Sequence, residues 1–266
     1  SGGFSIGGLV DIEGCIYSGR INTTDRSGGF VGYAESTTRI ANSLFNPQEG
    51  STIVGGTFYH ISNTATITNS YYTRALGTLL QGKAPRTVMA GENVTIETVS
   101  PVGSPTSSDG YNGVYSVSGI TAYATGIQHG GTFYYGSGDN VSLTLSHSDR
   151  TGYTAGYTAS AGTLSGTENP YTLTMPDDGD VTINATWTPI TYSITYNLNG
   201  GELTTEKNSY TIESDDITLD EPTRKGYAFG GWYESSNFSG KAVTTIAHGS
   251  TGNKTFYAKW LVPYID

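Results

Sequence analysis

The sequence predicts an all-β to β-rich chain, in which a short β-solenoid (β-helix-like) is followed by two small β-sheet modules in tandem. Three observations carry this prediction: a pattern that returns every 27 or 28 residues near the N-terminus, alternating apolar and polar runs further on, and a composition poor in helix formers. Glycine occurs 37 times in 266 residues, and only 14 % of the residues are charged. Long helical patterns, and the Ala, Glu, Lys and Leu enrichment that supports them, are missing.

The first predicted domain, residues 1–83, repeats a short pattern of Ile, any residue, Gly or Asn, Cys or Ser, an apolar residue and an aromatic one. The copies begin at Ile12, Ile40 and Ile67, which are 28 and 27 residues apart. Gly-Gly pairs precede the later copies at 28–29 and 55–56, with 2–3 or 7–8 as the first pair. A fixed period of this size is typical of a solenoid, whose repeats stack as coils.

Stacked coils bring equivalent residues into ladders. We expect one apolar ladder, one aromatic ladder and one tight corner that admits only small side chains. Asn42 and Asn69 suit the left-handed backbone of a bend next to that corner. The members are, in this order, Ile12, Ile40 and Ile67; Tyr17, Phe45 and Tyr72; and Cys15, Ser43 and Ser70.

The second and third predicted domains, residues 84–187 and 188–266, have related patterns. Gly82–Pro85 is expected to link the first domain to the second, in which residues 100–113 are expected to form an exposed loop. Gly152-Tyr153 is followed by an alternating strand that ends in Ala-x-Trp at Trp187, and Gly226-Tyr227 is followed by the same ending at Trp260. The Tyr-to-Trp separations are 34 and 33 residues, so the two domains are expected to be relatives.

Three motifs of the third domain carry a family resemblance. They are N-L-N-G-G at 197–201, P-T-R-K-G-Y-x-F-x-G-W-Y at 222–233 and K-T-F-Y-A-K-W at 254–260. In this order they resemble the Listeria–Bacteroides repeat, also called the internalin B-repeat. The resemblance implies a β-grasp-like module of a bacterial surface protein, and residues 162–177 resemble a divergent form of the same repeat. The resemblance implies a location for the protein, at the bacterial surface, and no particular reaction.

The repeats of the first domain carry a second resemblance. The Gly-Gly-Phe/Leu and Ile-x-Asn-Ser-x-Tyr patterns resemble the GLUG motif of secreted bacterial proteins, some of which are peptidases. Ser1-Gly2-Gly3-Phe4 opens in the middle of this pattern, so we expect the chain to be part of a longer protein. The short joint Thr188-Pro189 restricts motion and favours an extended rod.

Composition excludes several partners. The formal net charge is −10 and the pI is about 4.7, and such an acidic surface repels nucleic acid and anionic membranes. No apolar run approaches the ~18 residues of a membrane span, so no membrane insertion is expected. The single Cys15 excludes an internal disulfide, and we expect it to be a small buried residue.

No catalytic, cofactor or metal constellation is evident in the sequence. Gly77–Lys83 matches the G-x-x-x-x-G-K skeleton of a P-loop, but Ala84 supplies no hydroxyl for Mg²⁺ and no helix pattern follows. The acidic turn at 177–180 suits a tight bend and leaves calcium as an open alternative. The four histidines, His60, His129, His147 and His248, are isolated from one another.

Tyrosine is the residue type best suited to a recognition surface, because it combines a flat apolar face with a hydroxyl. Most of the 20 tyrosines fall on the apolar parity of strands and are expected in the core. Those expected to be exposed, and therefore candidate ligand contacts, are Tyr71, Tyr72, Tyr111, Tyr134 and Tyr135.

These observations predict a non-enzymatic segment of a secreted or cell-surface bacterial protein. The predicted role is adhesion or presentation, with contact to glycans or proteins of a host or a neighbouring cell. Two alternatives stay open: a passive stalk, and an accessory region of a large secreted peptidase or glycosidase. No cofactor is expected, and the predicted location is extracellular, at the bacterial cell surface.

Overall fold

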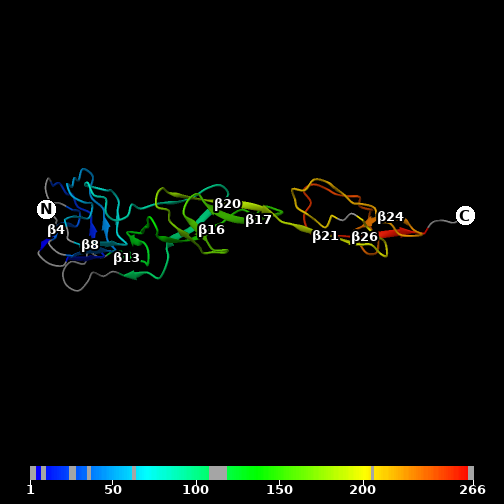
Figure 1. The fold of residues 1–266 in the computed structure, drawn as a ribbon, viewed down its shortest axis with the longest axis horizontal. Helices are drawn as coiled ribbons and strands as arrows, with labels where there is room; N and C mark the ends of the chain where they lie inside the picture. Colours follow the sequence, from blue (N-terminus) through cyan, green and yellow to red (C-terminus); the bar gives the residue numbers. More distant parts are fainter. Residues whose placement is uncertain are drawn as a thin grey trace. The chain divides into compact units, whose positions relative to one another are not determined.

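The computed structural model describes residues 4–6, 10–23, 28–34, 37–61, 64–107, 119–204 and 207–262. Within these ranges the protein is all-β, with no helix, as the sequence predicts. The chain forms two compact units (Figure 1). The N-terminal unit contains residues 1–148 and 157–185, and the C-terminal unit contains residues 149–156 and 186–266. The division into three domains stays a prediction.

The N-terminal unit begins with the predicted β-solenoid. Three parallel sheets have the strand orders β1-β4-β7, β2-β5-β8 and β3-β6-β9, so each coil contributes one strand to every sheet. The strands are β1 (Phe4–Ile6), β2 (Val10–Glu13), β3 (Ile16–Tyr17), β4 (Val31–Ala34), β5 (Thr37–Ala41), β6 (Leu44–Phe45), β7 (Tyr59–Ile61), β8 (Thr64–Thr68) and β9 (Tyr71–Tyr72).

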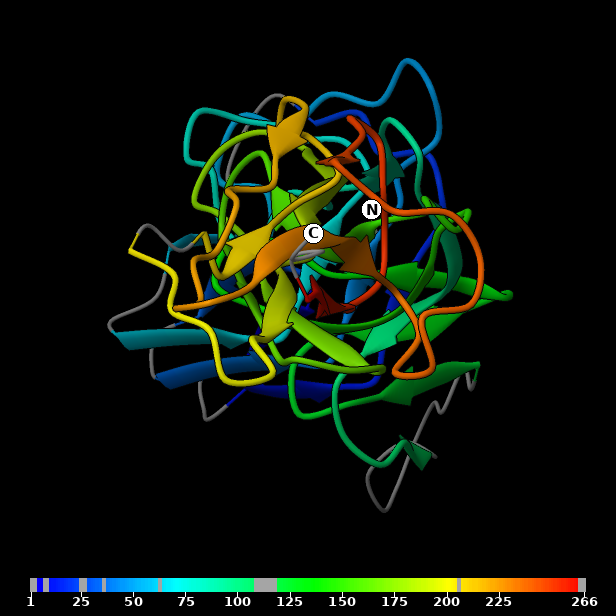
Figure 2. The ribbon, with the colours of Figure 1, turned by 90° about the vertical axis from the view of Figure 1, so that its right-hand side faces the viewer.

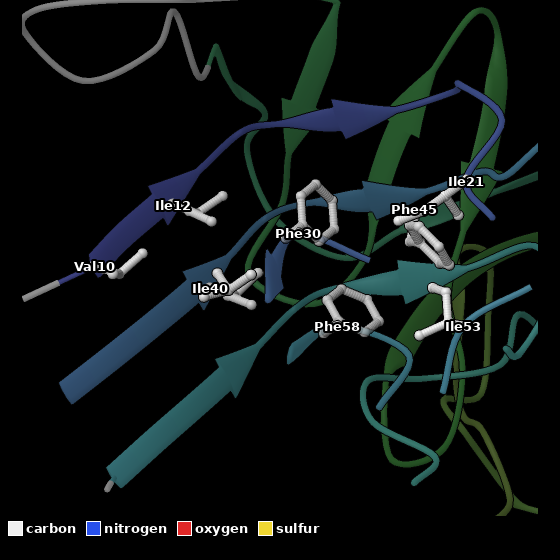
Figure 3. Close-up of a cluster of buried hydrophobic side chains, with 9 residues drawn as sticks. Val10, Ile12, Ile21, Phe30, Ile40, Phe45, Ile53 and Phe58 are labelled. Carbon is white, nitrogen blue, oxygen red and sulfur yellow. The ribbon is translucent and has the colours of Figure 1, made fainter. Parts of the chain in front are cut away.

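The register of these sheets confirms the predicted ladders. Ile12 pairs with Ile40 and Ile40 with Ile67, while Phe45 pairs with Tyr17 on one side and Tyr72 on the other. Figure 3 shows Ile12 and Ile40 side by side on successive coils. Ile40 and Phe45 are fully buried, because the middle coil is covered on both sides.

Serine hydroxyls fasten the tight corner between coils. The Ser70 hydroxyl donates to the Thr68 carbonyl (2.8 Å) and accepts the Ser43 N–H (3.1 Å). The Ser43 hydroxyl in turn donates to the Ala41 carbonyl (2.7 Å) and accepts the Cys15 N–H (3.2 Å). This corner therefore requires a small side chain with one donor and one acceptor. In the first coil this position is occupied by Cys15, whose thiol is half-buried.

The bend beside this corner has the expected left-handed backbone, with φ of +49° at Asn42 and +44° at Asn69. The asparagine side chains also connect the coils: Asn69 Nδ2 donates to Asn42 Oδ1 (2.7 Å), and Asn42 Nδ2 donates to Glu13 Oε1 (3.1 Å). Asparagine at this position thus adopts the left-handed backbone of the bend and also hydrogen-bonds to the neighbouring coil.

The Gly-Gly pairs allow the coils to approach each other. A Cβ atom on Gly29 would lie 2.2 Å from the Thr57 carbonyl oxygen and 2.6 Å from the Phe45 ring. The phenylalanines that follow the pairs, Phe30 and Phe58, stack with a centroid distance of 5.4 Å. Figure 3 shows these two rings beside Phe45 in the solenoid core.

Three further sheets follow, with the strand orders β11-β16-β19-β18, β12-β13-β14-β15 and β10-β20-β17. Val141, Leu143 and Leu173 are fully buried between them. The strands are β10 (Val88–Ala90), β11 (Thr95–Pro101), β12 (Thr106–Ser107), β13 (Ile120–Ala122), β14 (Ile127–His129), β15 (Thr132–Tyr134), β16 (Asn140–Ser146), β17 (Tyr153–Ala159), β18 (Thr163–Ser165), β19 (Tyr171–Thr174) and β20 (Val181–Pro189).

Two segments of this region differ from the sequence-based expectation. The stretch 100–113 is not a loop throughout, because Pro101 ends β11 as a buried residue and Thr106–Ser107 form β12. The expected linker Gly82–Pro85 is not free of the solenoid, since the Lys83 N–H donates to the Ser70 carbonyl (2.9 Å).

The C-terminal unit has a four-stranded sheet with the order β22-β21-β26-β24. The first and last of these strands along the chain, β21 and β26, are adjacent and parallel, which is the arrangement of a β-grasp sheet. Figure 1 shows β21, β26 and β24 together, and Figure 2 shows the same strands in yellow to red. The strands are β21 (Tyr192–Asn197), β22 (Ser209–Tyr210), β23 (Ile217–Thr218), β24 (Ala228–Tyr233), β25 (Thr245–Ile246) and β26 (Lys254–Leu261).

The core of this unit contains Trp232, which is 1 % exposed, with Phe256 and Ala258 beside it. Trp260 is half-buried, and its indole N–H donates to the Leu198 carbonyl (2.9 Å). β10, β20 and β17 have the same neighbour relations as β21, β26 and β24, with β10 parallel to β20. This agreement supports the expected kinship of the second and third segments.

Candidate functional site

The tyrosines named as candidate ligand contacts are mostly inside the protein. Tyr71 is 0 % exposed and Tyr135 is 6 % exposed, so the expectation that they lie at the surface is wrong. Tyr72 and Tyr134 are half-buried. Tyr111 lies outside the described residues. The local alternation of apolar and polar residues does not predict this burial, because the side chains of Tyr71 and Tyr135 are covered by segments distant in sequence.

Tyr71 belongs to a junction between the solenoid and the following sheets. Its ring packs with Leu44 on the solenoid side and with Ile120 and Ile127 on β13 and β14. Asn69 reinforces this junction: its Oδ1 accepts the Gly126 N–H (2.6 Å) and its Nδ2 donates to the Gly126 carbonyl (3.1 Å). The coil that ends the solenoid is therefore capped, which repeat folds require for stability.

A carboxylate is buried at the same junction. Asp139 is 1 % exposed; it pairs with the Lys83 ammonium and accepts the Tyr71 hydroxyl and the Gly136 N–H (2.8 Å). Burial, together with the Asp139 charge, raises the pKa of Tyr71 far above its usual range. The Tyr71 hydroxyl therefore keeps its proton and donates a hydrogen bond to Asp139. The polar groups of the cluster are partners of one another, which gives the cluster a structural role. No sequence pattern reveals it, because Lys83 and Asp139 are 56 residues apart.

The acidic turn at 177–180 uses its carboxylates separately. Asp177 accepts the Ser137 hydroxyl (2.8 Å), Asp178 accepts the Gly179 N–H (2.9 Å), and Asp180 accepts the Thr87 N–H (2.8 Å). The last contact lowers the pKa of Asp180. Each of the three carboxylates thus accepts a different donor, as in a tight turn whose side chains support the backbone.

Other chemistry has equally little support in the described parts of the chain. His, Cys, Asp and Glu side chains nowhere gather there in threes with the geometry of a metal site. Burial raises the pKa of the Cys15 thiol, so this cysteine is a poor nucleophile. A membrane-crossing helix is also not found among these residues.

One open pocket of about 630 Å³ lies in the C-terminal unit, at the turn before β24. Arg224 is one of its two cations and has the contacts that the structure gives in most detail. The guanidinium lies 4.0 Å from the centroid of the Tyr227 ring and 6.0 Å from that of Trp260, and Nη1 donates to the Asn199 carbonyl (2.9 Å). The lining residues are Gly200, Glu202, Thr223, Arg224, Lys225 and Tyr227.

Exposed apolar side chains gather beside this pocket. Tyr227 is 41 % exposed, Leu261 48 % and Val262 77 %. Ala228 pairs with Leu261 in the sheet, which places Tyr227 and Val262 at the same end of β24 and β26. We call Arg224, Lys225, Tyr227 and Val262 the Tyr227 surface. It offers one aromatic face, one aliphatic side chain and two cations, a combination typical of a protein contact.

The described residues thus define a protein built of β modules, with one open pocket in the C-terminal unit and an exposed aromatic and apolar surface beside it. Residues 192–259 match the Listeria-Bacteroides repeat domain, which confirms the resemblance of this module. Domains of this family are found in bacterial surface proteins. No curated protein matches the chain.

Proposed function

We propose that the chain is a non-enzymatic adhesion or presentation segment of a secreted or cell-surface bacterial protein, located outside the cell. The match of residues 192–259 to a repeat domain of bacterial surface proteins carries this proposal. The GLUG-type identity of the solenoid repeats is part of it and rests on their Gly-Gly-Phe/Leu and Ile-x-Asn-Ser-x-Tyr patterns. The proposed partners are glycans or proteins of a host or a neighbouring cell, and no cofactor takes part.

The Tyr227 surface is the best-supported contact surface for such a partner. Its cations stand out on a chain whose formal net charge is −10, so they favour an acidic group on the partner. The buried Tyr71 and Tyr135 support no such role. Tyr72 and Tyr134, which are half-buried, stay secondary candidates.

Binding of the recombinant chain to an array of glycans and extracellular-matrix proteins tests this function. We expect saturable binding to one class and its loss in Arg224→Ser and Tyr227→Ser. Lys241→Ser removes an exposed cation from another loop and is the matched control. Absence of binding at high protein concentration would contradict adhesion.

A passive stalk is the second candidate, and the burial of Tyr71 and Tyr135 favours it. It gives a different result in the same experiment: no array binding, and surface substitutions that change only stability. Activity toward a peptidase or glycosidase substrate would contradict both candidates.

A further inference from the structure

The sequence Arg-x-Gly-Tyr occurs twice, at 150–153 and 224–227, and folds in the same way each time. The Tyr153 N–H donates to the Arg150 carbonyl and the Tyr227 N–H to the Arg224 carbonyl, both at 3.1 Å. The guanidiniums lie 3.9 Å and 4.0 Å from the centroids of the tyrosine rings. Gly152 and Gly226 both have a φ of +81°, which glycine adopts readily. We call these the first and the second Arg-x-Gly-Tyr turn.

The first turn, which belongs to the C-terminal unit, is docked on the loop at 211–214 of that unit. A Cβ atom on the buried Gly152 would lie 2.7 Å from Ile212 Cδ1, so the glycine allows the isoleucine to cover the turn. The Tyr153 hydroxyl donates to Glu213 Oε1 (2.8 Å), and the Ile190 N–H donates to the Gly152 carbonyl (2.9 Å). The contact raises the pKa of Tyr153, chiefly through the hydrogen bond to Glu213.

The second turn has the same shape without such a partner. Gly226 is exposed, and no atom lies within 4 Å of a Cβ placed on it. Among the described residues, the Tyr227 hydroxyl has no hydrogen-bond partner, and its side chain is 41 % exposed. Leu261 and Val262 are exposed at the same end of the sheet. The second turn thus presents the features that the first turn buries.

We propose that the second turn is a docking site for the 211–214-type loop of a further Listeria–Bacteroides-type module joined in tandem. The occupant is defined by its chemistry, a branched apolar residue followed by a carboxylate, as in Ile212-Glu213. The isoleucine covers Gly226, and the carboxylate accepts the Tyr227 hydroxyl beside Arg224. Lys225, which replaces Thr151 of the first turn, adds a second cation near that carboxylate.

A second copy of this chain is a poorer occupant. Its own 211–214 loop is already covered by its own first turn, through Ile212 and Glu213. A module joined in tandem brings a free loop at millimolar effective concentration, which suits a small contact of this kind. The Arg-x-Gly-Tyr turn is then a connector that recurs from module to module.

The test is a fusion in which Val262 of the chain is followed by a second copy of residues 190–262, so that Leu261 and Val262 take the places that Thr188 and Pro189 have between Trp187 and Ile190. The appended copy carries Thr211→Ser as a mass tag. The photoreactive amino acid p-benzoylphenylalanine replaces Tyr227 in one sample, Tyr153 in a second and the exposed Lys241 in a third. Cross-linked tryptic peptides are identified by mass spectrometry.

We expect the probe at 227 to cross-link the tagged 208–224 peptide and the probe at 153 to cross-link the untagged one. Ile212→Ser with Glu213→Gln in the appended copy, which adds no tryptic site, lowers the yield from 227 to that from 241 and leaves the yield from 153 unchanged. A yield from 227 equal to that from 241 before these substitutions overturns the proposal. Cross-links from 227 to a separate chain, or failure of the probe at 153 to reach 208–224, also overturn it.

The connector and the proposed adhesive contact use the same Tyr227 surface, so one copy of this surface holds either the loop of a further module or an external partner, and the two experiments distinguish these occupants. A chain that binds no glycan and still cross-links through position 227 retains the connector and loses the adhesion. A chain that binds a glycan but gives no cross-link from position 227 retains the adhesion and loses the connector.

Discussion

Single hydroxyl groups hold the coils of the solenoid in register. Ser43 is fully buried and serves the Cys15 N–H on one side and the Ala41 carbonyl on the other. We expect Ser43→Ala to lower the free energy of unfolding of the N-terminal unit by about 1–3 kcal/mol, because the part-buried Cys15 N–H loses its acceptor. Urea unfolding followed by circular dichroism measures this change.

Thr37→Ala is the matched control for Ser43→Ala. Its hydroxyl also bridges two coils, to the Thr64 hydroxyl at 2.9 Å, but it does so in solvent. We expect a change within about 0.5 kcal/mol. Equal effects of the two substitutions would show that burial of the serine does not matter.

Tyr71 makes the N-terminal unit sensitive to alkali. Its pKa is raised in the folded state, so above about pH 10 the unfolded chain releases the phenolic proton while the folded chain retains it. Stability is therefore fully present below pH 10 and falls as the pH rises further. We expect Tyr71→Phe to reduce this slope by up to about 1.4 kcal/mol per pH unit. Parallel stability–pH curves for the two proteins would contradict the assignment.

The two tryptophans of the β-grasp sheet differ in their contribution. Trp232 is 1 % exposed and Trp260 is half-buried. We expect Trp232→Ala to cost about 3–5 kcal/mol, because it empties a core site, and Trp260→Ala to cost less. Chemical unfolding of the two variants compares them, and the reverse order would place the core elsewhere in the module.

Residue-level prediction succeeded where the determinants are local. The left-handed bend at Asn42 and the corner at Ser43 follow from residue types within one repeat, so the pattern alone indicates them. The buried Asp139 could not be found in this way. Its partners Tyr71 and Lys83 are 68 and 56 residues away, and only the folded junction brings them together.

At the scale of the element, coil spacing depends on the Gly-Gly pairs. We expect Gly29→Ala to destabilise the solenoid by about 1–3 kcal/mol or more, because the new methyl group meets the rigid Thr57 carbonyl. Gly19→Ala is the control, since its nearest neighbour is the Tyr17 hydroxyl at 3.2 Å, the end of a side chain that can move. Thermal unfolding of both variants tests this; equal melting temperatures would contradict the close approach.

The sequence predicts where strands form better than it predicts which segments pack against them. Alternation predicted β16 and β20, and the 27- and 28-residue period predicted which solenoid strands pair. It did not predict β12, since Thr106–Ser107 lie in a Pro- and Ser-rich stretch that pairs only through β13. Nor did alternation reveal that β13 and β14 cover Tyr71.

At the scale of the whole molecule, the two units carry different reporters. All three tryptophans, Trp187, Trp232 and Trp260, lie in the C-terminal unit. We expect tryptophan emission to follow that unit alone, while circular dichroism follows both. Urea unfolding should therefore give two non-coincident curves, and Trp232→Ala should shift only the emission curve. Coincident curves in both proteins would show that the units unfold together.

The stacked coils of the solenoid have a consequence for its ancestry. Successive coils meet through the same isoleucine pairs and the same serine hydroxyl contacts, so duplication of one repeat inserts a coil whose two faces already match its neighbours. Each such event lengthens the stack by about 4.8 Å, the spacing between adjacent strands. Recombination within a gene can thus adjust length in discrete increments, without inventing any new interface.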